Sequence, residues 1–320
     1  MSKVELKRNN GLDFNSTLFE GLVINKSAVE RRAASIAKRR AVKKEWQAAW
    51  LLKAISCIDL TTLAGDDTKG NVLRLCAKAK SPVRADILEE LEMEGQNLHV
   101  GAVCVYHKSI PDAVNALSAS EIPVAAVSTG FPAGKISLSE KLRQIKASVK
   151  LGAKEIDIVV SRDLILLSKW RELYKEVKAC REACGEAHMK TILATGEIPT
   201  YSKVAKASWV CMMAGSDFIK TSTGKESVNA TLGVSLVMTR CIREYYELTG
   251  YKVGFKPAGG IRTAKDAISW LILMKEELGN DWLQPNLFRF GASSLLADIE
   301  RQLEHYVTGR YSPYFRHPMA

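Results

Sequence analysis

Two stretches of similar design decide the fold: "DFIKTSTGK" at residues 217–225 and "KVGFKPAGG" at residues 252–260. Each is a short apolar run that ends in a lysine and passes into glycines and small residues. Such a run, bounded by turn residues, predicts a buried strand that ends in a tight turn. The lysines, Lys220 and Lys256, are separated by the length of one strand and one helix, so we expect them on neighbouring strands.

Runs of the same kind recur along the chain, with helical patterns between most of them. We predict eight strands, at residues 55–60, 100–106, 122–130, 155–160, 189–197, 217–222, 252–257 and 287–292. Their nearly continuous apolar character is typical of parallel strands covered on both faces. Eight such strands alternating with helices predict an α/β fold of the TIM (β/α)8 barrel type. An open doubly wound sheet is the main alternative, but the G-x-G-x-x-G turn that often follows its first strand is absent from the sequence.

Composition is that of an ordinary globular protein, with 320 residues, 47% hydrophobic and 25% charged. We predict a helical extension over residues 1–53, a barrel over 54–308 and a tail over 309–320. No apolar run approaches the ~18 residues of a membrane span, and the first residues lack the apolar core of a signal peptide. We therefore expect a cytoplasmic protein that does not interact with membranes.

The cysteines and histidines predict neither disulfides nor a metal site. Seven cysteines are scattered along the chain without a C-x-x-C pair, and the five histidines form no ligand motif. Reduced, buried thiols are the expectation for a cytosolic protein. We predict no cofactor and no metal.

The extension is basic, with 12 Lys/Arg against 5 Asp/Glu in residues 1–53, within a total net charge of +11. One interpretation is a nucleic-acid-binding or localisation segment. The other is a pair of helices packed on the barrel with a solvated basic face, and we favour it because no nucleic-acid-binding motif accompanies the charge. The apolar positions at helical spacing are Val29, Ala33, Ile36 and Ala37, and the pattern continues less regularly through Trp46, Ala49, Trp50 and Lys53.

The barrel prediction directs attention to charged residues at strand ends, where barrel enzymes build their sites. Lys220, Lys256 and Asp157 are placed by side-chain alternation on the inward face, because the helix layer would bury them without partners. Two ammonium groups about 5 Å apart repel by about 3 kcal/mol at an effective dielectric constant of about 20. Repulsion and burial both lower a lysine pKa, which makes one amine a nucleophile toward carbonyl carbon. Asp157 would keep the second lysine protonated and carry protons; the alternative is a buried ion pair without chemistry.

Glycine-rich turns follow the predicted strands six, seven and eight. In these barrels the loops after strands seven and eight, with a helix N-terminus, are the usual phosphate site. Three adjacent turns of this character therefore predict a small phosphorylated carbonyl substrate. The candidate phosphate- and substrate-binding residues are Gly224, Lys225, Gly259, Gly260, Arg262, Gly291, Ser293 and Ser294.

Ten stretches in order across residues 55–296, among them "IDLTTLAGDDT", "DFIKTSTGK", "FKPAGGIRT" and "FGASSLL", resemble the deoxyribose-phosphate aldolase family. The resemblance implies a metal-free class I aldolase that reversibly cleaves 2-deoxy-D-ribose 5-phosphate to D-glyceraldehyde 3-phosphate and acetaldehyde. The family's imine-forming lysine falls on Lys220 and its second lysine on Lys256, while its acids fall on Asp157 and Asp59. Its phosphate contacts fall on the eight residues given above.

Several alternatives stay open at this point. Another imine-forming barrel enzyme, such as a transaldolase or a sugar-bisphosphate aldolase, fits the lysine pair, and a basic nucleic-acid-binding protein with an inert barrel is the alternative from another class. The chain lacks the terminal tyrosine that closes over the site in bacterial family members, so the role of its tail is open. Cys104 lies in a strand near the site, where we interpret it as a buried apolar residue rather than a reactive thiol. A homodimer and the physiological direction are left open.

Overall fold

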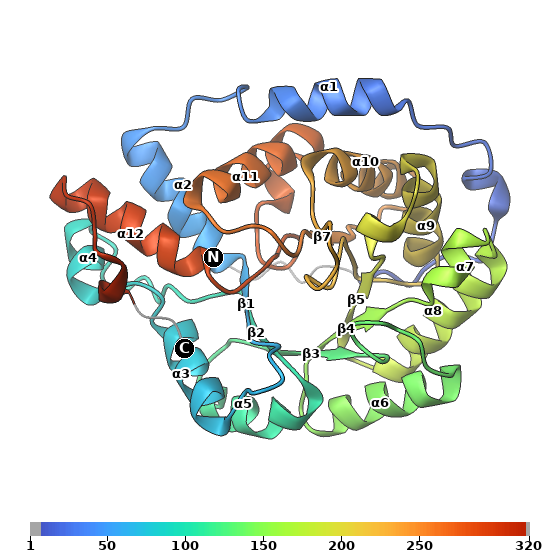
Figure 1. Cartoon of the computed structure of the whole chain (residues 1–320), viewed down its shortest axis with the longest axis horizontal. Coiled ribbons are helices and arrows are strands. Elements are labelled where there is room, and N and C mark those ends of the chain that lie inside the picture. The colour runs from blue at the N-terminus through green and yellow to red at the C-terminus, as the bar shows by residue number, and fades with distance from the viewer. Residues whose placement is uncertain (1–7, 318–320) are drawn as a thin grey trace.

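The computed structural model describes residues 8–317, and its centre is a barrel of eight parallel strands (Figure 1). All eight predicted strands are present, which confirms the (β/α)8 fold. Their bounds are β1 Ile58–Thr61, β2 Ala102–Val105, β3 Val124–Ser128, β4 Glu155–Val159, β5 His188–Ile192, β6 Phe218–Lys220, β7 Gly254–Lys256 and β8 Phe290–Ala292.

The sheet closes on itself through hydrogen bonds between the two strands at its ends. The order is β7-β6-β5-β4-β3-β2-β1-β8, and every neighbouring pair is parallel. Beyond this ladder, Phe255 in β7 bridges to Phe288, and its N–H donates to the carbonyl of Leu287 at 2.9 Å. A second bridge joins Ala258 to Gly291. Closure leaves no free edge, so the interior is reached only from the barrel ends.

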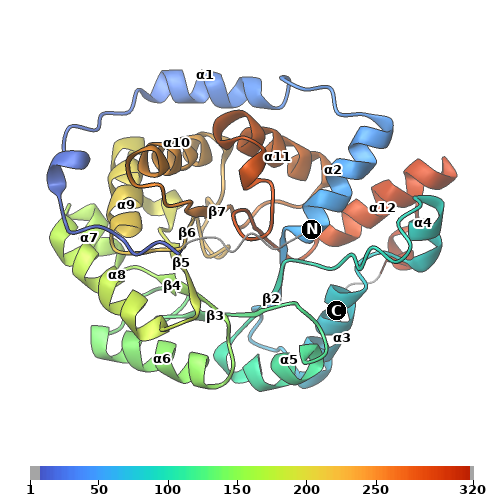
Figure 2. The ribbon, with the colours of Figure 1, turned by 180° about the vertical axis from the view of Figure 1, so that it is seen from behind.

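A ring of helices covers the outside of the barrel (Figure 2). Outward strand residues such as Ile156, Ile158 and Ile219 are buried under this ring, while the residues between them point inward. Several helices start at a Ser or Thr whose hydroxyl accepts a backbone N–H, as Ser137 and Thr231 do. The bounds are α3 Lys69–Lys80, α4 Ala85–Glu90, α5 Ile110–Leu117, α6 Leu138–Lys150, α7 Arg162–Leu166, α8 Trp170–Cys184, α9 Tyr201–Met213, α10 Leu232–Thr249, α11 Ala264–Leu278 and α12 Leu295–Thr308.

Two further helices precede the barrel, α1 Lys26–Ile36 and α2 Lys44–Ser56. The first lies across α10 and α11, and the second packs on α11 and α12 (Figures 1 and 2). The buried face of α1 is Val29, Ala33 and Ile36, three of the four positions that its spacing predicted. The fourth, Ala37, was wrong, because it follows the last helical residue and is exposed. The prediction for α2 was wrong, because Trp46 is 66% exposed and the buried face is Ala48, Leu51, Ala54 and Ile55. Its buried residues follow helical spacing three to four apart, whereas the large tryptophans drew the prediction to the neighbouring face.

The start of the first strand also differs from its prediction. Helix α2 runs to Ser56, so β1 begins at Ile58 rather than at residue 55. Helix and strand meet in one continuous apolar segment, in which Ile55, Cys57 and Ile58 are all fully buried. Hydrophobicity alone gives no boundary there. The predicted boundary between an extension over 1–53 and a barrel over 54–308 falls inside α2, which runs continuously from Lys44 to Ser56. The division into these parts therefore stays a prediction.

Part of the basic charge of the extension is paired with the barrel. Arg32 in α1 lies 3.1 Å from Glu277, and Arg40 beyond it lies 2.6 Å from Glu276, both carboxylates being on α11. The extension is therefore attached to the barrel by apolar packing and by ion pairs. In the described part of the chain, no helix is long and apolar enough to cross a membrane.

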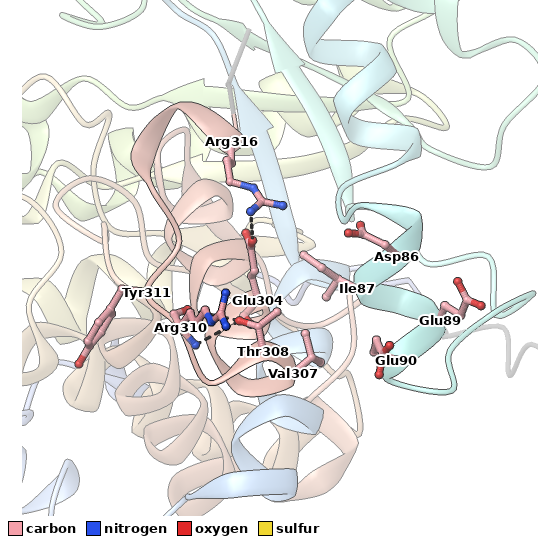
Figure 3. A pocket seen from close by; sticks show the side chains of 10 residues that line it. All are labelled: Asp86, Ile87, Glu89, Glu90, Glu304, Val307, Thr308, Arg310, Tyr311 and Arg316. Atoms are coloured by element: carbon pink, nitrogen blue, oxygen red, sulfur yellow. Dashed lines mark hydrogen bonds and ion pairs between the residues drawn. The ribbon is translucent and has the colours of Figure 1, made fainter.

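The tail after α12 turns back along that helix. Ser312 donates to Glu304 at 2.6 Å, Arg316 lies 3.1 Å from the same carboxylate, and the ring of His317 contacts it at 2.6 Å. A cavity of about 490 Å³ lies between this tail and α4. Figure 3 shows Arg316 directed toward Glu304 and the acidic side chains of α4 on the opposite side. Up to His317, the tail thus lies against α12 and α4.

Candidate active site

Lys220 is the last residue of β6, and its side chain points into the barrel. The preceding Ile219 points outward and is fully buried under the helices, so alternation turns Lys220 inward. The register of β6 and β7 pairs Lys220 directly with Lys256. Both side chains are almost completely buried, with Lys220 3% exposed. The structure therefore brings the two lysines of the opening motifs side by side.

Asp157 in β4 lies between the ammonium groups. Its Oδ2 atom is 2.7 Å from Lys220 Nζ and 2.8 Å from Lys256 Nζ, while its Oδ1 atom is 3.1 Å from Lys190 Nζ. One fully buried carboxylate is thus shared by three cations. A single negative charge cannot neutralise all three, and this imbalance determines the protonation of the site.

Asp59 in β1 completes the set of predicted catalytic residues. Its Oδ2 atom contacts Lys256 Nζ, and its side chain is fully buried. Lys256 therefore has two carboxylate partners, Asp59 and Asp157, whereas among the described residues Lys220 contacts carboxylate only at the shared Oδ2 of Asp157. The structure brings all four residues into one ion network.

This difference in partners separates the pKa values of the two lysines. Burial lowers the pKa of Lys220, the positive charge of Lys256 lowers it further, and Asp157 opposes both. Burial also acts against the charge of Lys256, but Asp157 and Asp59 together outweigh it and raise its pKa. The pKa of Asp157 is held well below its usual value, because the three lysines outweigh the effect of burial. Lys220 is the amine that loses its proton most readily, and Lys256 stays cationic.

The relative size of these causes differs from what the sequence predicts. The sequence predicts repulsion between the two lysines as the first cause of the lowered pKa, whereas burial is the larger cause for Lys220. Asp157 lies between the two ammonium groups and compensates part of their repulsion. Burial dominates because the closed barrel removes most of the water around the amine, and Lys220 is only 3% exposed.

Lys220 opens toward a cavity of about 240 Å³ at the carboxyl ends of β6, β7 and β8. All eight residues predicted to bind phosphate line it, together with Thr61, Leu63 and Thr223. Gly224, Gly259 and Gly260 adopt positive φ angles, between +81° and +85°, which favour glycine. Lys225, Arg262, Ser293 and Ser294 are exposed at the rim, so an amine deep in the barrel faces hydrogen-bond donors at its mouth.

This arrangement has a buried amine, a shared carboxylate and a mouth lined with hydrogen-bond donors. It agrees with the proteins that the sequence resembles. The model of the DeoC/LacD family aldolases matches residues 53–300. The chain belongs to this aldolase family. Its sequence is 57% identical to the deoxyribose-phosphate aldolase of Bos taurus and 59% identical to that of Mus musculus, in each case over 97% of this chain and 98% of the relative. A putative deoxyribose-phosphate aldolase from Toxoplasma gondii shares the fold at a TM-score of 0.69 and 18% identity, covering 84% of this chain and 98% of that one.

Three charged residues of this DeoC/LacD aldolase site were missed in the sequence. Glu155, Lys190 and Arg289 lie inside the barrel, next to the four predicted residues. Glu155 accepts from Arg289 Nη2 at 2.8 Å and contacts Lys190 Nζ, and Arg289 Nη1 also contacts Asp59 Oδ1. A signal was present, since Glu155 is two positions before Asp157 and shares its inward face. Lys190 and Arg289 are likewise single charges within apolar strand runs.

The remaining candidates near this aldolase site are Cys104 and the tail. Cys104 in β2 is buried, and burial raises the pKa of its thiol, which favours the protonated and unreactive form. The tail up to His317 contributes no residue to the lining of the cavity at β6–β8. Among residues 8–317, no group of three or more His, Cys, Asp or Glu side chains is arranged to hold a metal ion.

Proposed function

We propose that the chain is a class I deoxyribose-phosphate aldolase in which Lys220 forms an imine with the substrate. The reaction is the reversible cleavage of 2-deoxy-D-ribose 5-phosphate to D-glyceraldehyde 3-phosphate and acetaldehyde. The observation that carries the proposal is the position of Lys220 Nζ, which shares Asp157 Oδ2 with Lys256 and borders the cavity at the mouth of the barrel. Relatives at 57–59% identity over nearly their whole length carry the name of this enzyme, which supports the choice of sugar.

The proposed reaction begins with attack of the neutral amine of Lys220 on the C1 carbonyl carbon of the open-chain sugar. The carbinolamine loses water and becomes a protonated imine. Removal of the proton from the C3 hydroxyl group breaks the C2–C3 bond, whose electron pair passes into the imine to give an enamine. C3 leaves as the aldehyde carbon of D-glyceraldehyde 3-phosphate. Protonation of the enamine carbon and hydrolysis of the imine release acetaldehyde and restore the amine.

Asp157 and Lys256 are proposed to move the protons of this sequence. Asp157 lies 2.7 Å from the amine, within reach of a proton released by the carbinolamine. Lys256, cationic and 2.8 Å from the same oxygen, supplies the complementary acid. Asp59 binds Lys256 and keeps it charged in this position. Asp59 therefore acts through Lys256, while Asp157 and Lys256 act on the reacting atoms.

The phosphate group is proposed to bind at the rim formed by the turns after β6, β7 and β8. Lys225 and Arg262 supply positive charge there, and Ser293 and Ser294 supply hydroxyl donors. Ser294 immediately precedes α12, whose first backbone N–H groups and positive end of the helix dipole favour an anion. With the phosphate at the rim, the aldehyde end of a five-carbon sugar points inward to Lys220.

The finer assignments follow from this chemistry. We propose that the enzyme acts in the cytoplasm in the catabolism of deoxyribose phosphate and deoxyribonucleosides. Its partner is the small phosphorylated sugar. A homodimer is the assembly to test by light scattering of the purified chain.

The test is reductive trapping. Acetaldehyde and borohydride should leave a two-carbon adduct on Lys220, mapped by mass spectrometry, and Lys220→Ala should abolish both the adduct and turnover. Removing the nucleophile is expected to cost at least about 10⁴-fold in kcat. A substrate panel with fructose 1,6-bisphosphate and transaldolase substrates tests the choice of sugar. An active enzyme without an adduct on Lys220, or one inactivated by EDTA, contradicts the proposal.

A further inference from the structure

The barrel interior holds seven ionisable groups that contact one another. They are almost completely buried. They come from β1, β4, β5, β6 and β7 and from the residue just before β8. Four are cations and three are carboxylates: Lys190, Lys220, Lys256 and Arg289 against Asp59, Glu155 and Asp157.

Full ionisation would therefore leave one positive charge in excess. An unpaired buried charge is costly, and the usual outcome is that one group becomes neutral. Arg289 does not lose its proton in proteins, and it contacts both Asp59 and Glu155. Loss of one lysine proton balances the network with three cations and three carboxylates.

The contacts identify Lys220 as the lysine that gives up its proton. Lys190 contacts Glu155, lies 3.1 Å from Asp157 Oδ1 and 3.7 Å from Asp59. Lys256 contacts both Asp59 and Asp157. Within residues 8–317, the one carboxylate that Lys220 contacts is Asp157, through an oxygen that Lys256 also binds. Lys220 is thus the least compensated of the cations.

This places a specific task on Lys190, which occupies the other oxygen of Asp157. If Oδ1 were free, the carboxylate would have more negative charge to stabilise a proton on Lys220. We propose that Lys190, held by Glu155, is a positioning residue that occupies Asp157 and thereby sets the pH above which Lys220 acts as a nucleophile. This inference rests on the imine chemistry proposed for Lys220. Lys190 does not line the cavity at β6–β8, so it acts through Asp157 and not on the substrate.

Lys220 is the group around Asp157 that loses its proton, because the other ionisable groups keep their protonation states. Burial opposes the charge of Lys190, but Asp157, Glu155 and Asp59 outweigh it and raise its pKa, so it stays cationic. The further titratable neighbours in the described chain are Cys104 on β2, Cys57 just before β1 and His188 at the start of β5. Burial raises the pKa of both thiols and keeps them protonated, and it lowers the pKa of His188, which favours the neutral imidazole. Strand β3, whose sequence is VAAVS, contributes no titratable side chain. The charges that face Lys190 and Lys220 are therefore those of the seven-group network.

The experiment compares the pH dependence of kcat/KM for deoxyribose 5-phosphate cleavage from about pH 5 to 10. Lys190→Met leaves three cations for three carboxylates, so Lys220 keeps its proton to higher pH. The acid limb of the pH–rate profile, which is the range where activity rises as Lys220 loses its proton, should move up by about one to two pH units. Activity at neutral pH should then be about 10- to 100-fold lower and should recover at alkaline pH. Lys190→Arg keeps the charge and should return the limb toward its wild-type position.

A second variant predicts the opposite sign. Glu155→Gln removes a carboxylate and increases the excess of positive charge, so the limb should move to lower pH. The matched control is Lys141→Met, because Lys141 is equally buried but lies on α6, where it pairs with Glu176 outside the barrel. Its acid limb should stay at the wild-type pH. A merely structural role for Lys190 would lower activity evenly at every pH.

The outcomes separate this inference from the proposed function. An unmoved limb in Lys190→Met, a Lys190→Arg limb like that of Lys190→Met, or shifts of the same sign in Lys190→Met and Glu155→Gln would overturn it. If Lys190→Met does not fold, the direction of the Glu155→Gln shift decides alone. Trapping in the wild-type enzyme comes first: no adduct on Lys220 removes both proposals, whereas an adduct together with unmoved limbs removes only the role of Lys190.

Discussion

Lys141 and Lys220 are both buried lysines of the same barrel, but their surroundings differ. Lys141 lies between α6 and α8, where its ammonium group is 3.1 Å from Glu176, 2.8 Å from Ser161 Oγ and close to a backbone carbonyl. One cation there has one carboxylate to itself. Inside the barrel, Lys220 shares a single oxygen of Asp157 with Lys256. Burial alone therefore does not make an amine reactive; the ratio of cations to carboxylates around it does.

Lys256→Leu should remove most of the difference between the surroundings of Lys220 and those of Lys141. Of the three variants that test this comparison, it is expected to have the largest effect. Without Lys256, Asp157 pairs with Lys220 more closely, the pKa of Lys220 rises, and less of the amine is neutral at pH 7. The proposed proton donor is lost as well, so kcat/KM should fall by about 10²- to 10³-fold, with the acid limb at higher pH. The pH–rate profile is the measurement. A profile that falls without moving would contradict the coupling of the two lysines.

Arg262→Ala tests whether an exposed cation of the same site acts differently from the buried lysines. Arg262 lines the mouth of the cavity and is exposed, outside the buried ion network of Lys220, and it is proposed to contact the phosphate. We expect KM for the phosphorylated sugar to rise by about tenfold, with kcat nearly unchanged. Unphosphorylated deoxyribose is the control substrate, for which the variant should equal the wild type. Equal losses on both sugars would contradict a phosphate contact.

Lys141→Met should have the smallest effect on activity and a clear one on stability. It leaves the carboxylate of Glu176 buried without its ion partner, which is expected to cost about 3 kcal/mol in the free energy of unfolding. Because Lys141 contacts Glu176, Ser161 and the backbone carbonyl of Val159, none of which belongs to the seven-group network, kcat and the pH profile should match the wild type. Denaturant unfolding and steady-state kinetics on one preparation check both parts. A shifted acid limb would show that the two clusters are coupled.

The sequence predicted the fold well because its signals are local and repeated. Each strand is a short apolar run that ends in turn residues, and eight repeats of that pattern leave few alternatives. The inward direction of Lys220, Lys256 and Asp157 also followed from alternation. Boundaries were less certain, as at β1, where apolar helix and strand adjoin without a polar break. The buried face of α2 was missed, because a face of alanine, leucine and isoleucine packs on the barrel, while Trp46 is exposed and Trp50 is only partly buried.

What the sequence determined by itself is the set of strands, their inward charges and the position of the site at their carboxyl ends. The tertiary structure decided how those charges are shared. Asp157 contacts three lysines, Lys190 joins from β5, and Arg289 joins from the residue just before β8. These contacts depend on strands brought together by barrel closure. Protonation is a property of the whole network, because each buried charge responds to all its neighbours within a few ångströms. No single stretch of the chain contains that information.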